Sequence, residues 1–139
     1  MKVVIDTNIF VMCISERSLF HKIFKDLKEG AYEIVVTTEI LLEYEEIIAK
    51  KYGIATVNFF LRLLDELENV HFINTYYHWN LIENDPDDNK FVDAAIATGA
   101  KFLVTEDKHY NILKTIDFPQ LDIINADDFL LELENYKNK

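Results

Sequence analysis

The sequence predicts an α/β fold in which a parallel sheet is covered by helices on both faces. Short runs of β-branched residues alternate with longer stretches of helical hydrophobic period, which is the pattern of βαβ units. The strand-like runs are too apolar for a sheet with one solvated face. The chain has 139 residues, half of them hydrophobic, with only three Gly and two Pro, so we expect a single domain spanning residues 1–139.

The elements follow from these patterns in order. The expected strands are Val3–Asp6, Ile34–Thr37, Phe72–Asn74, Phe102–Thr105 and Asp122–Ile124. The expected helices are Ser18–Glu29, Thr38–Lys51, Ala55–Leu67, Asp88–Thr98, Lys108–Lys114 and Ala126–Glu134. Gly30 and Gly99 stand where a left-handed residue commonly ends a helix. The polar residues 135–139 are expected to fray.

Charge and cysteine content exclude several classes of protein. Fourteen Lys and Arg oppose 25 Asp and Glu, a net charge of -11, which repels phosphate backbones and argues against a simple basic-patch nucleic-acid binder. The single Cys13 cannot form an intramolecular disulfide and is expected to be a buried apolar thiol. No long apolar segment opens the chain, so we expect a cytoplasmic protein without a membrane span.

Acidic residues stand at or just after the ends of two predicted strands. Asp6 ends the first strand, and Asp107 follows the fourth by two residues. Ligands of open parallel sheets bind beyond the carboxyl ends of the strands, so these two acids form a candidate pair. Each has an ordinary alternative, since Asp6 suits a turn and Asp107 suits the N-cap of the helix at Lys108.

Two further acids are candidates from their positions on predicted helices. Asp88 stands at the head of the buried stripe of its helix, whereas Asp93 lies well away from it. Glu43 and Glu45 border the buried stripe of the helix that begins at Thr38, on opposite sides, and the helical wheel does not choose between them. Glu43 is the candidate because it stands nearer the start of the helix, by the carboxyl end of the second strand. An ordinary charged helix face is the alternative for Glu43 and explains Glu39, Glu45 and Glu46.

Convergence of these four carboxylates would require bound cations or protonation. An all-oxygen ligand set suits Mg²⁺ or Mn²⁺, as one or two ions, and such ions support hydrolysis of phosphodiesters. A calcium loop at Asp85, Asp87 and Asn89 is excluded, because Lys90 stands where Gly is needed and Ile96 where Glu is needed.

Several segments together resemble PIN-domain ribonucleases, the family of many prokaryotic toxin–antitoxin toxins. They are VVIDTNIF, TTEILLEYEEII, DPDDNKFVDAAIATGAKFLVTEDKHY and IINADDFLLEL, and they span nearly the whole chain. The resemblance implies a three-layer α/β/α sandwich with a short, mostly parallel central sheet. It also implies a metal-dependent endoribonuclease that leaves a 5′-phosphate and a 3′-hydroxyl, frequent homodimerisation and a partner antitoxin.

Carried over residue by residue, the resemblance implies four catalytic, metal-binding acids: Asp6, Glu43, Asp88 and Asp107. Asn8 and Thr105 resemble the polar residues that support the first and last acids. Asp93 is the next candidate for the third acid, and Asp85 and Asp87 are also close in sequence.

Other interpretations remain open at this stage. Arg17, Lys90 and Lys108 would meet RNA phosphates or serve as ordinary surface charge. A phosphoaspartate-type, magnesium-binding phosphotransfer or receiver module also places acids at strand ends, but it gives no role to Glu43. A non-catalytic interaction domain of the same fold would have to retain four costly carboxylates without a metal.

Overall fold

We analysed a computed structural model that describes residues 1–82, 86–117 and 119–137. Its centre is a sheet of five strands in the order β3-β2-β1-β4-β5, and every neighbouring pair is parallel. The strands are β1 (Lys2–Ile5), β2 (Glu33–Val36), β3 (Val70–Phe72), β4 (Phe102–Val104) and β5 (Asp122–Ile124). The predicted parallel sheet is therefore confirmed.

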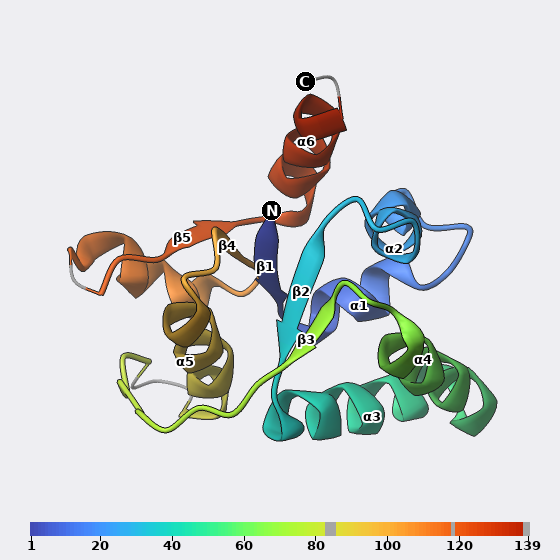
Figure 1. Ribbon diagram of the computed structural model, residues 1–139, viewed down its shortest axis with the longest axis horizontal. Coiled ribbons are helices and arrows are strands. Elements are labelled where there is room, and N and C mark those ends of the chain that lie inside the picture. The colour runs from blue at the N-terminus through green and yellow to red at the C-terminus, as the bar shows by residue number, and fades with distance from the viewer. Residues whose placement is uncertain (83–85, 118, 138–139) are drawn as a thin grey trace.

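Helices flank the sheet and form the outer layers of an α/β/α sandwich (Figure 1). They are α1 (Thr7–Cys13), α2 (His21–Lys28), α3 (Thr38–Tyr52), α4 (Ile54–Glu66), α5 (Asn89–Thr98) and α6 (Ala126–Lys137), with 3₁₀ segments η1 (Pro86–Asp88) and η2 (Lys108–Thr115). In Figure 1, α1, α2 and α4 lie on one side of the sheet and α5 on the other, while α3 begins directly below β2. None of the helices in these described ranges combines the length and the apolar composition that a membrane span requires.

Several elements differ from the sequence prediction. Helix α2 begins at His21 and not at Ser18, and the helix expected at Lys108–Lys114 is the 3₁₀ segment η2. The seven-residue helix α1 was not predicted, because it is short, rich in β-branched residues and buried on most of its sides. Strand β3 lies two residues earlier than expected, at Val70–Phe72, where it pairs in register with Ile34–Val36. Helix α6 continues through Lys137, so the tail expected to fray from residue 135 is helical there.

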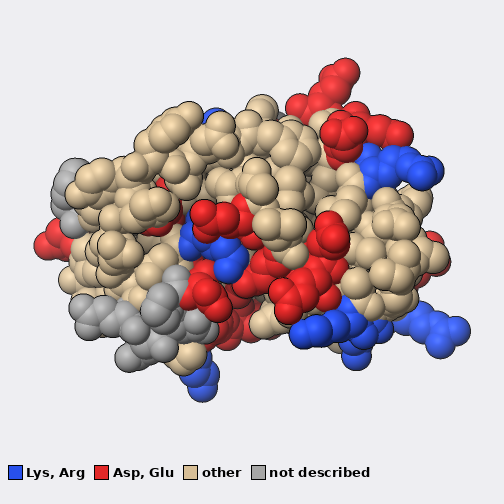
Figure 2. All heavy atoms as spheres, turned by 90° about the horizontal axis from the view of Figure 1, so that it is seen from below, with Lys and Arg blue, Asp and Glu red and all other residues tan. Residues whose placement is uncertain are grey.

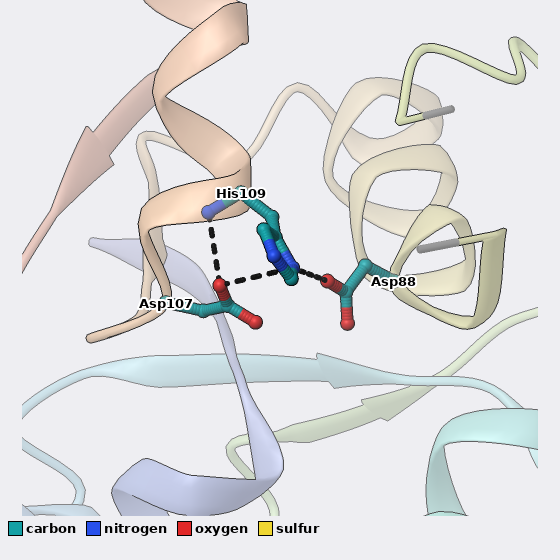
Figure 3. A group of neighbouring side chains, drawn as sticks. All are labelled: Asp88, Asp107 and His109. Atoms are coloured by element: carbon teal, nitrogen blue, oxygen red, sulfur yellow. Dashed lines mark hydrogen bonds and ion pairs between the residues drawn. The ribbon is translucent and has the colours of Figure 1, made fainter. Parts of the chain in front are cut away.

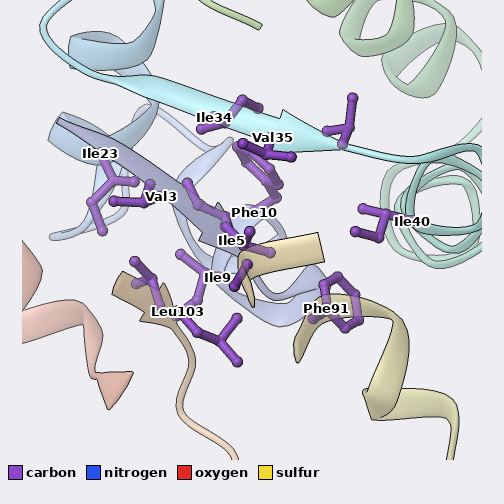
Figure 4. Packing of buried hydrophobic residues seen from close by; sticks show 14 of the residues in the cluster. Val3, Ile5, Ile9, Phe10, Ile23, Ile34, Val35, Ile40, Phe91 and Leu103 are labelled. Carbon is purple, nitrogen blue, oxygen red and sulfur yellow. The ribbon is translucent and has the colours of Figure 1, made fainter. Parts of the chain in front are cut away.

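The core lies between the sheet and the helices on both of its faces (Figure 4). Val3, Val4 and Ile5 of the central strand are fully buried. Phe10 of α1 packs edge to face on Tyr44 of α3, with ring centroids 5.0 Å apart. Cys13 is buried as predicted, and burial raises the pKa of its thiol far above the ordinary value.

Gly99 ends α5 in the left-handed conformation, with φ of 63° and ψ of 35°. Gly99→Ala is expected to lower the free energy of unfolding by about 1 kcal/mol, because a Cβ is strained at this φ. A Cβ at this position would meet no atom within 4 Å, so backbone strain is the only local cost. Urea unfolding measures the loss. Gly99→Asn is the matched control and should lose less, since Asn tolerates left-handed backbone better; equal losses would contradict this explanation.

Candidate metal centre

The carboxyl ends of the strands form an acidic face of the molecule. Figure 2 views the molecule from below Figure 1, the side on which β2 runs into α3, and shows Asp and Glu side chains gathered near the centre with basic atoms among them.

Asp6 is placed by the register of the two central strands. Ile5 pairs with Val104, so the next residues, Asp6 and Thr105, leave adjacent strands side by side. The Thr105 hydroxyl donates to Asp6 Oδ2 at 2.7 Å, and Thr105 Oγ1 accepts from the backbone N–H of Asp107 at 3.0 Å. One hydroxyl therefore connects the first acid with the loop that carries the last.

The Asp6 carboxylate is in an unfavourable position for a purely structural residue. Asp6 occupies the N-cap position of α1, yet its side chain makes no capping hydrogen bond, and only 5% of the residue is exposed. Burial, with the negative charges of Glu43 and Asp107, raises the pKa of Asp6 to about 6, although the hydrogen bond from Thr105 opposes this shift. The capping alternative therefore does not account for Asp6.

Glu43 reaches the same region from α3. Thr37 caps this helix by accepting a hydrogen bond from the Ile40 N–H. Glu43 Oε2 accepts a hydrogen bond from the Thr7 hydroxyl, beside Asp6, and Glu43 Oε1 lies 2.8 Å from Lys90 Nζ. The neighbouring Tyr44 donates to the carbonyl of Ile5, the residue before Asp6. Helix α3 thus contacts the junction of β1 and α1 on both sides of Asp6.

Asp88 and Asp107 approach each other through His109 (Figure 3). His109 Nδ1 lies 3.3 Å from Asp107 Oδ1 and 3.9 Å from Asp88 Oδ2. Asp107 also accepts the His109 N–H at 2.9 Å, which is the N-cap contact expected for η2. The three residues each offer one ligand atom, and these atoms lie within 4.8 Å of one another.

Tyr110 links this group to Asp6. Its hydroxyl donates to the backbone carbonyl of Asp88 at 3.4 Å. Burial, together with the negative charges of Asp6, Asp88 and Asp107, raises the pKa of Tyr110 well above its ordinary value. The side chains of these acids, which are far apart in the sequence, thus surround the same buried phenol.

Other predicted residues are placed differently. Asp93, expected to support the site, is 3% exposed and instead accepts the backbone N–H of Trp79 at 3.0 Å. Asn8 is exposed on the first turn of α1, and no side-chain hydrogen bond to Asp6 is found within the described ranges. Asp87 is exposed, and its carbonyl accepts from Lys90. Asp85 lies outside the described residues.

Sequence reasoning missed the site contacts of Thr7 and His109 and gave Lys90 a different role. Lys90 was considered as surface charge or as a phosphate contact, but it forms an ion pair with Glu43. Thr7 and His109 stand one and two residues from Asp6 and Asp107, so proximity to the strand-end acids was the available signal. Periodicity carries no such signal, because it describes helix faces and not contacts between elements.

The donor set fits a divalent cation. Carboxylates are hard oxygen ligands of Mg²⁺ and Mn²⁺, and the imidazole of His109 adds a nitrogen donor that transition-metal ions accept. The raised pKa of Asp6 reports carboxylate repulsion and burial, which a cation would relieve. Asp6, Glu43, Asp88 and Asp107 are therefore chemically suited to the ion that the sequence predicted.

Comparison with known proteins agrees with this architecture. A sequence model of the PIN domain matches residues 2–109. The structure of VapBC2 from Rickettsia felis, bound to a DNA fragment from their promoter, contains a similar chain: TM-score 0.58, 20% identity, with 90% of this chain and 98% of that chain covered. The PIN domain endonuclease Utp24 is also similar, at TM-score 0.50 and 19% identity, with 89% of this chain and 84% of that chain covered. No curated protein matches.

The chain folds as a parallel α/β/α sandwich with strand order β3-β2-β1-β4-β5 and acids beyond the carboxyl ends of its strands. The family model covers most of the chain, from β1 to η2. This chain belongs to the PIN domain family.

Proposed function

We propose that the chain is a divalent-metal-dependent endoribonuclease that hydrolyses RNA phosphodiester bonds. Three contacts at the carboxyl ends of the strands carry the proposal. Thr105 bonds both Asp6 and the Asp107 N–H, Glu43 accepts from Thr7 beside Asp6, and His109 lies within 4 Å of both Asp88 and Asp107. Family membership and the likeness to the PIN domain endonuclease Utp24 support it. A phosphoaspartate module is less well supported, because it gives Glu43 no role.

In this proposal Asp6, Glu43, Asp88 and Asp107 hold Mg²⁺ or Mn²⁺. The bound ion supplies activation of water and stabilisation of charge on the phosphodiester. Thr105 orients Asp6 through its hydroxyl, and Asp107 keeps its orientation by capping η2. Asp6 and Thr105 directly follow the paired strands β1 and β4, and Asp107 directly precedes η2, so rigid elements hold these side chains in place.

Two nitrogen-bearing side chains lie against the acids of the proposed site. Lys90 lies against Glu43, and His109 lies between Asp88 and Asp107. The charge of Lys90 lowers the mutual repulsion of the acids in the metal-free chain. Both side chains also offer hydrogen-bond donors to an anionic phosphate, which the acids alone would repel.

We further propose that the chain acts in the cytoplasm as the toxin of a toxin–antitoxin pair. The likeness of its fold to a chain of VapBC2 supports this assignment. Its antitoxin would cover the acidic face and block access to the carboxylates. We also propose that the chain forms a homodimer, because its resemblance to the PIN family implies frequent homodimerisation.

The proposal is tested by incubating purified protein with labelled single-stranded and stem-loop RNA in Mn²⁺ or in EDTA. Cleavage is expected in Mn²⁺ and not in EDTA. Asp107→Asn should reduce the rate by about a hundredfold or more, because a lost metal ligand removes several kcal/mol of transition-state stabilisation. Asn can still cap η2, so the variant should fold.

Asp122→Asn is the matched control, since Asp122 is exposed at the amino end of β5, the opposite end of the sheet. It should cleave as the unmodified chain does. Saturating Mn²⁺ should raise the Tm of the unmodified chain and of Asp122→Asn, and raise that of Asp107→Asn less. Cleavage that persists in EDTA, or that is unchanged in Asp107→Asn, would contradict the proposal.

A further inference from the structure

The chain between β3 and η1 carries consecutive aromatic side chains, Tyr76, Tyr77, His78 and Trp79, which we call the aromatic segment. It belongs to no helix or strand. Tyr76 is 89% exposed and Tyr77 is 66% exposed, while Trp79 is half-buried. Adjacent exposed rings at this density are typical of a contact surface.

Buried polar side chains of α5 fix the position of this segment. Asp93 Oδ1 accepts the Trp79 N–H at 3.0 Å, and Asp93 Oδ2 lies 3.2 Å from His78 Nδ1. Asn89 accepts the Ile82 N–H at 2.8 Å and donates to the Ile82 carbonyl at 3.0 Å. Helix α5 thus holds the chain at Trp79 and Ile82, directly after the two tyrosines, and such restraint lowers the entropic cost of binding.

His78 of the segment, and the residues just after the segment, line two cavities beside the candidate metal centre. A cavity of about 170 Å³ is lined by His78 and Asn80 together with Lys90, the residue that contacts Glu43. A second cavity, of about 390 Å³, is lined by Asn80 and Leu81 together with His109, which lies near Asp88 and Asp107. Figure 1 shows the chain after β3 passing beneath α5, at the same end of the sheet as the start of α3.

The charge of the protein restricts how it can hold a polyanion at this place. With a net charge of -11 and acids at the centre, affinity cannot come mainly from contacts between cations and phosphates. Stacking of bases on aromatic rings is the alternative source, because every base presents an uncharged face. Duplex RNA conceals these faces within its own stack, whereas single-stranded RNA exposes them.

We propose that the aromatic segment is a stacking surface that binds unpaired bases of single-stranded RNA beside the acidic cluster. Tyr76 and Tyr77 present the exposed faces, and Trp79 packs against Tyr77 with ring centroids 4.7 Å apart. The proposal rests on the nuclease function proposed above and defines its substrate as unpaired RNA. It also assigns to Asp93 the role of a positioning residue for the segment and not for the metal.

Trp79 is the only tryptophan of the chain, so its fluorescence reports on this segment directly. The probe is an unstructured RNA of about 10 nucleotides, titrated in EDTA so that cleavage does not interfere. Saturable quenching is expected for the single strand. The same strand annealed to its complement should bind at least about tenfold more weakly than the single strand does. Tyr76→Ala and Tyr77→Ala should each weaken binding about tenfold, and Tyr77→Phe should bind nearly as well as the unmodified chain.

Tyr136→Ala is the control, because Tyr136 is 51% exposed but lies on α6, outside the aromatic segment. It should leave RNA affinity unchanged. Equal affinity for duplex and single strand, or unchanged affinity in both tyrosine variants, would overturn the stacking proposal and leave the segment as a surface for a protein partner. If RNA quenches Trp79 but is not cleaved in Mn²⁺, the nuclease function is contradicted and the stacking proposal is not. If RNA is cleaved equally well by the tyrosine variants, the stacking proposal is contradicted and the nuclease function is not.

Discussion

Asp6→Asn is expected to abolish RNA cleavage while making the metal-free protein more stable. The Asn side chain is nearly isosteric and can still accept the hydrogen bond from Thr105. It is a poor ligand for a divalent cation, so cleavage in Mn²⁺ should fall by about a hundredfold or more. Loss of activity with a gain in stability separates a functional acid from a structural one.

The gain in stability follows from the raised pKa of Asp6. The folded chain holds this proton up to about pH 6, whereas the unfolded chain releases it near 3.8. As the pH rises between these values, the folded state loses stability relative to the unfolded state, by up to roughly 3 kcal/mol above pH 6. Asp6→Asn carries no such group and escapes this loss.

Urea unfolding of both proteins in EDTA, from pH 4 to pH 8, measures the effect. The free energy of unfolding of Asp6→Asn minus that of the unmodified chain should be near zero at pH 4 and should rise to its maximum above pH 6. Saturating Mn²⁺ should reduce this difference, since the ion compensates the carboxylate. A difference that is independent of pH would mean that burial and charge repulsion do not raise the pKa of Asp6.

Phe10→Ala is expected to cause the largest loss of stability, about 3–5 kcal/mol. Phe10 is fully buried, and its ring lies 5.0 Å from that of Tyr44 and 5.0 Å from that of Phe60. Truncation leaves a cavity between α1, α3 and α4 and removes two edge-to-face contacts. Since α1 and α3 carry Thr7 and Glu43, the same change should weaken Mn²⁺ binding.

Thermal and urea unfolding test this prediction, and the Tm should fall by roughly 10 °C or more. Phe59→Ala is the matched control, because Phe59 is the neighbour of Phe60 on α4 but is 60% exposed. It should change the free energy of unfolding by less than about 0.5 kcal/mol. Comparable losses in the two variants would show that the ring cluster does not dominate the packing of α1.

The sequence predicted the layers of this fold because they depend on local patterns. Apolar β-branched runs and helical stripes report which residues face a core, so the parallel sheet and most of the helices were found. The short helix α1 was missed for the same reason. It is buried on most sides, so no alternation between polar and apolar residues marks it.

For the site, the sequence alone determined the residue types and the end of the sheet at which they would gather. Acids that follow parallel strands must emerge at the carboxyl edge, which is how Asp6 and Asp107 were found. The tertiary structure decided which contacts these side chains make. The register of β1 and β4 sets Thr105 against Asp6, and packing of α3 turns Glu43 toward Thr7 and Lys90.

The choice between Asp88 and Asp93 shows the physical reason for this division. Both are buried near the start of α5, although helical periodicity placed only Asp88 at the buried stripe. Asp88 lies near His109 and Tyr110, whereas Asp93 holds the backbone of Trp79. Such partners are remote in the sequence, and they meet only because the packed core holds strands and helices in one relative position.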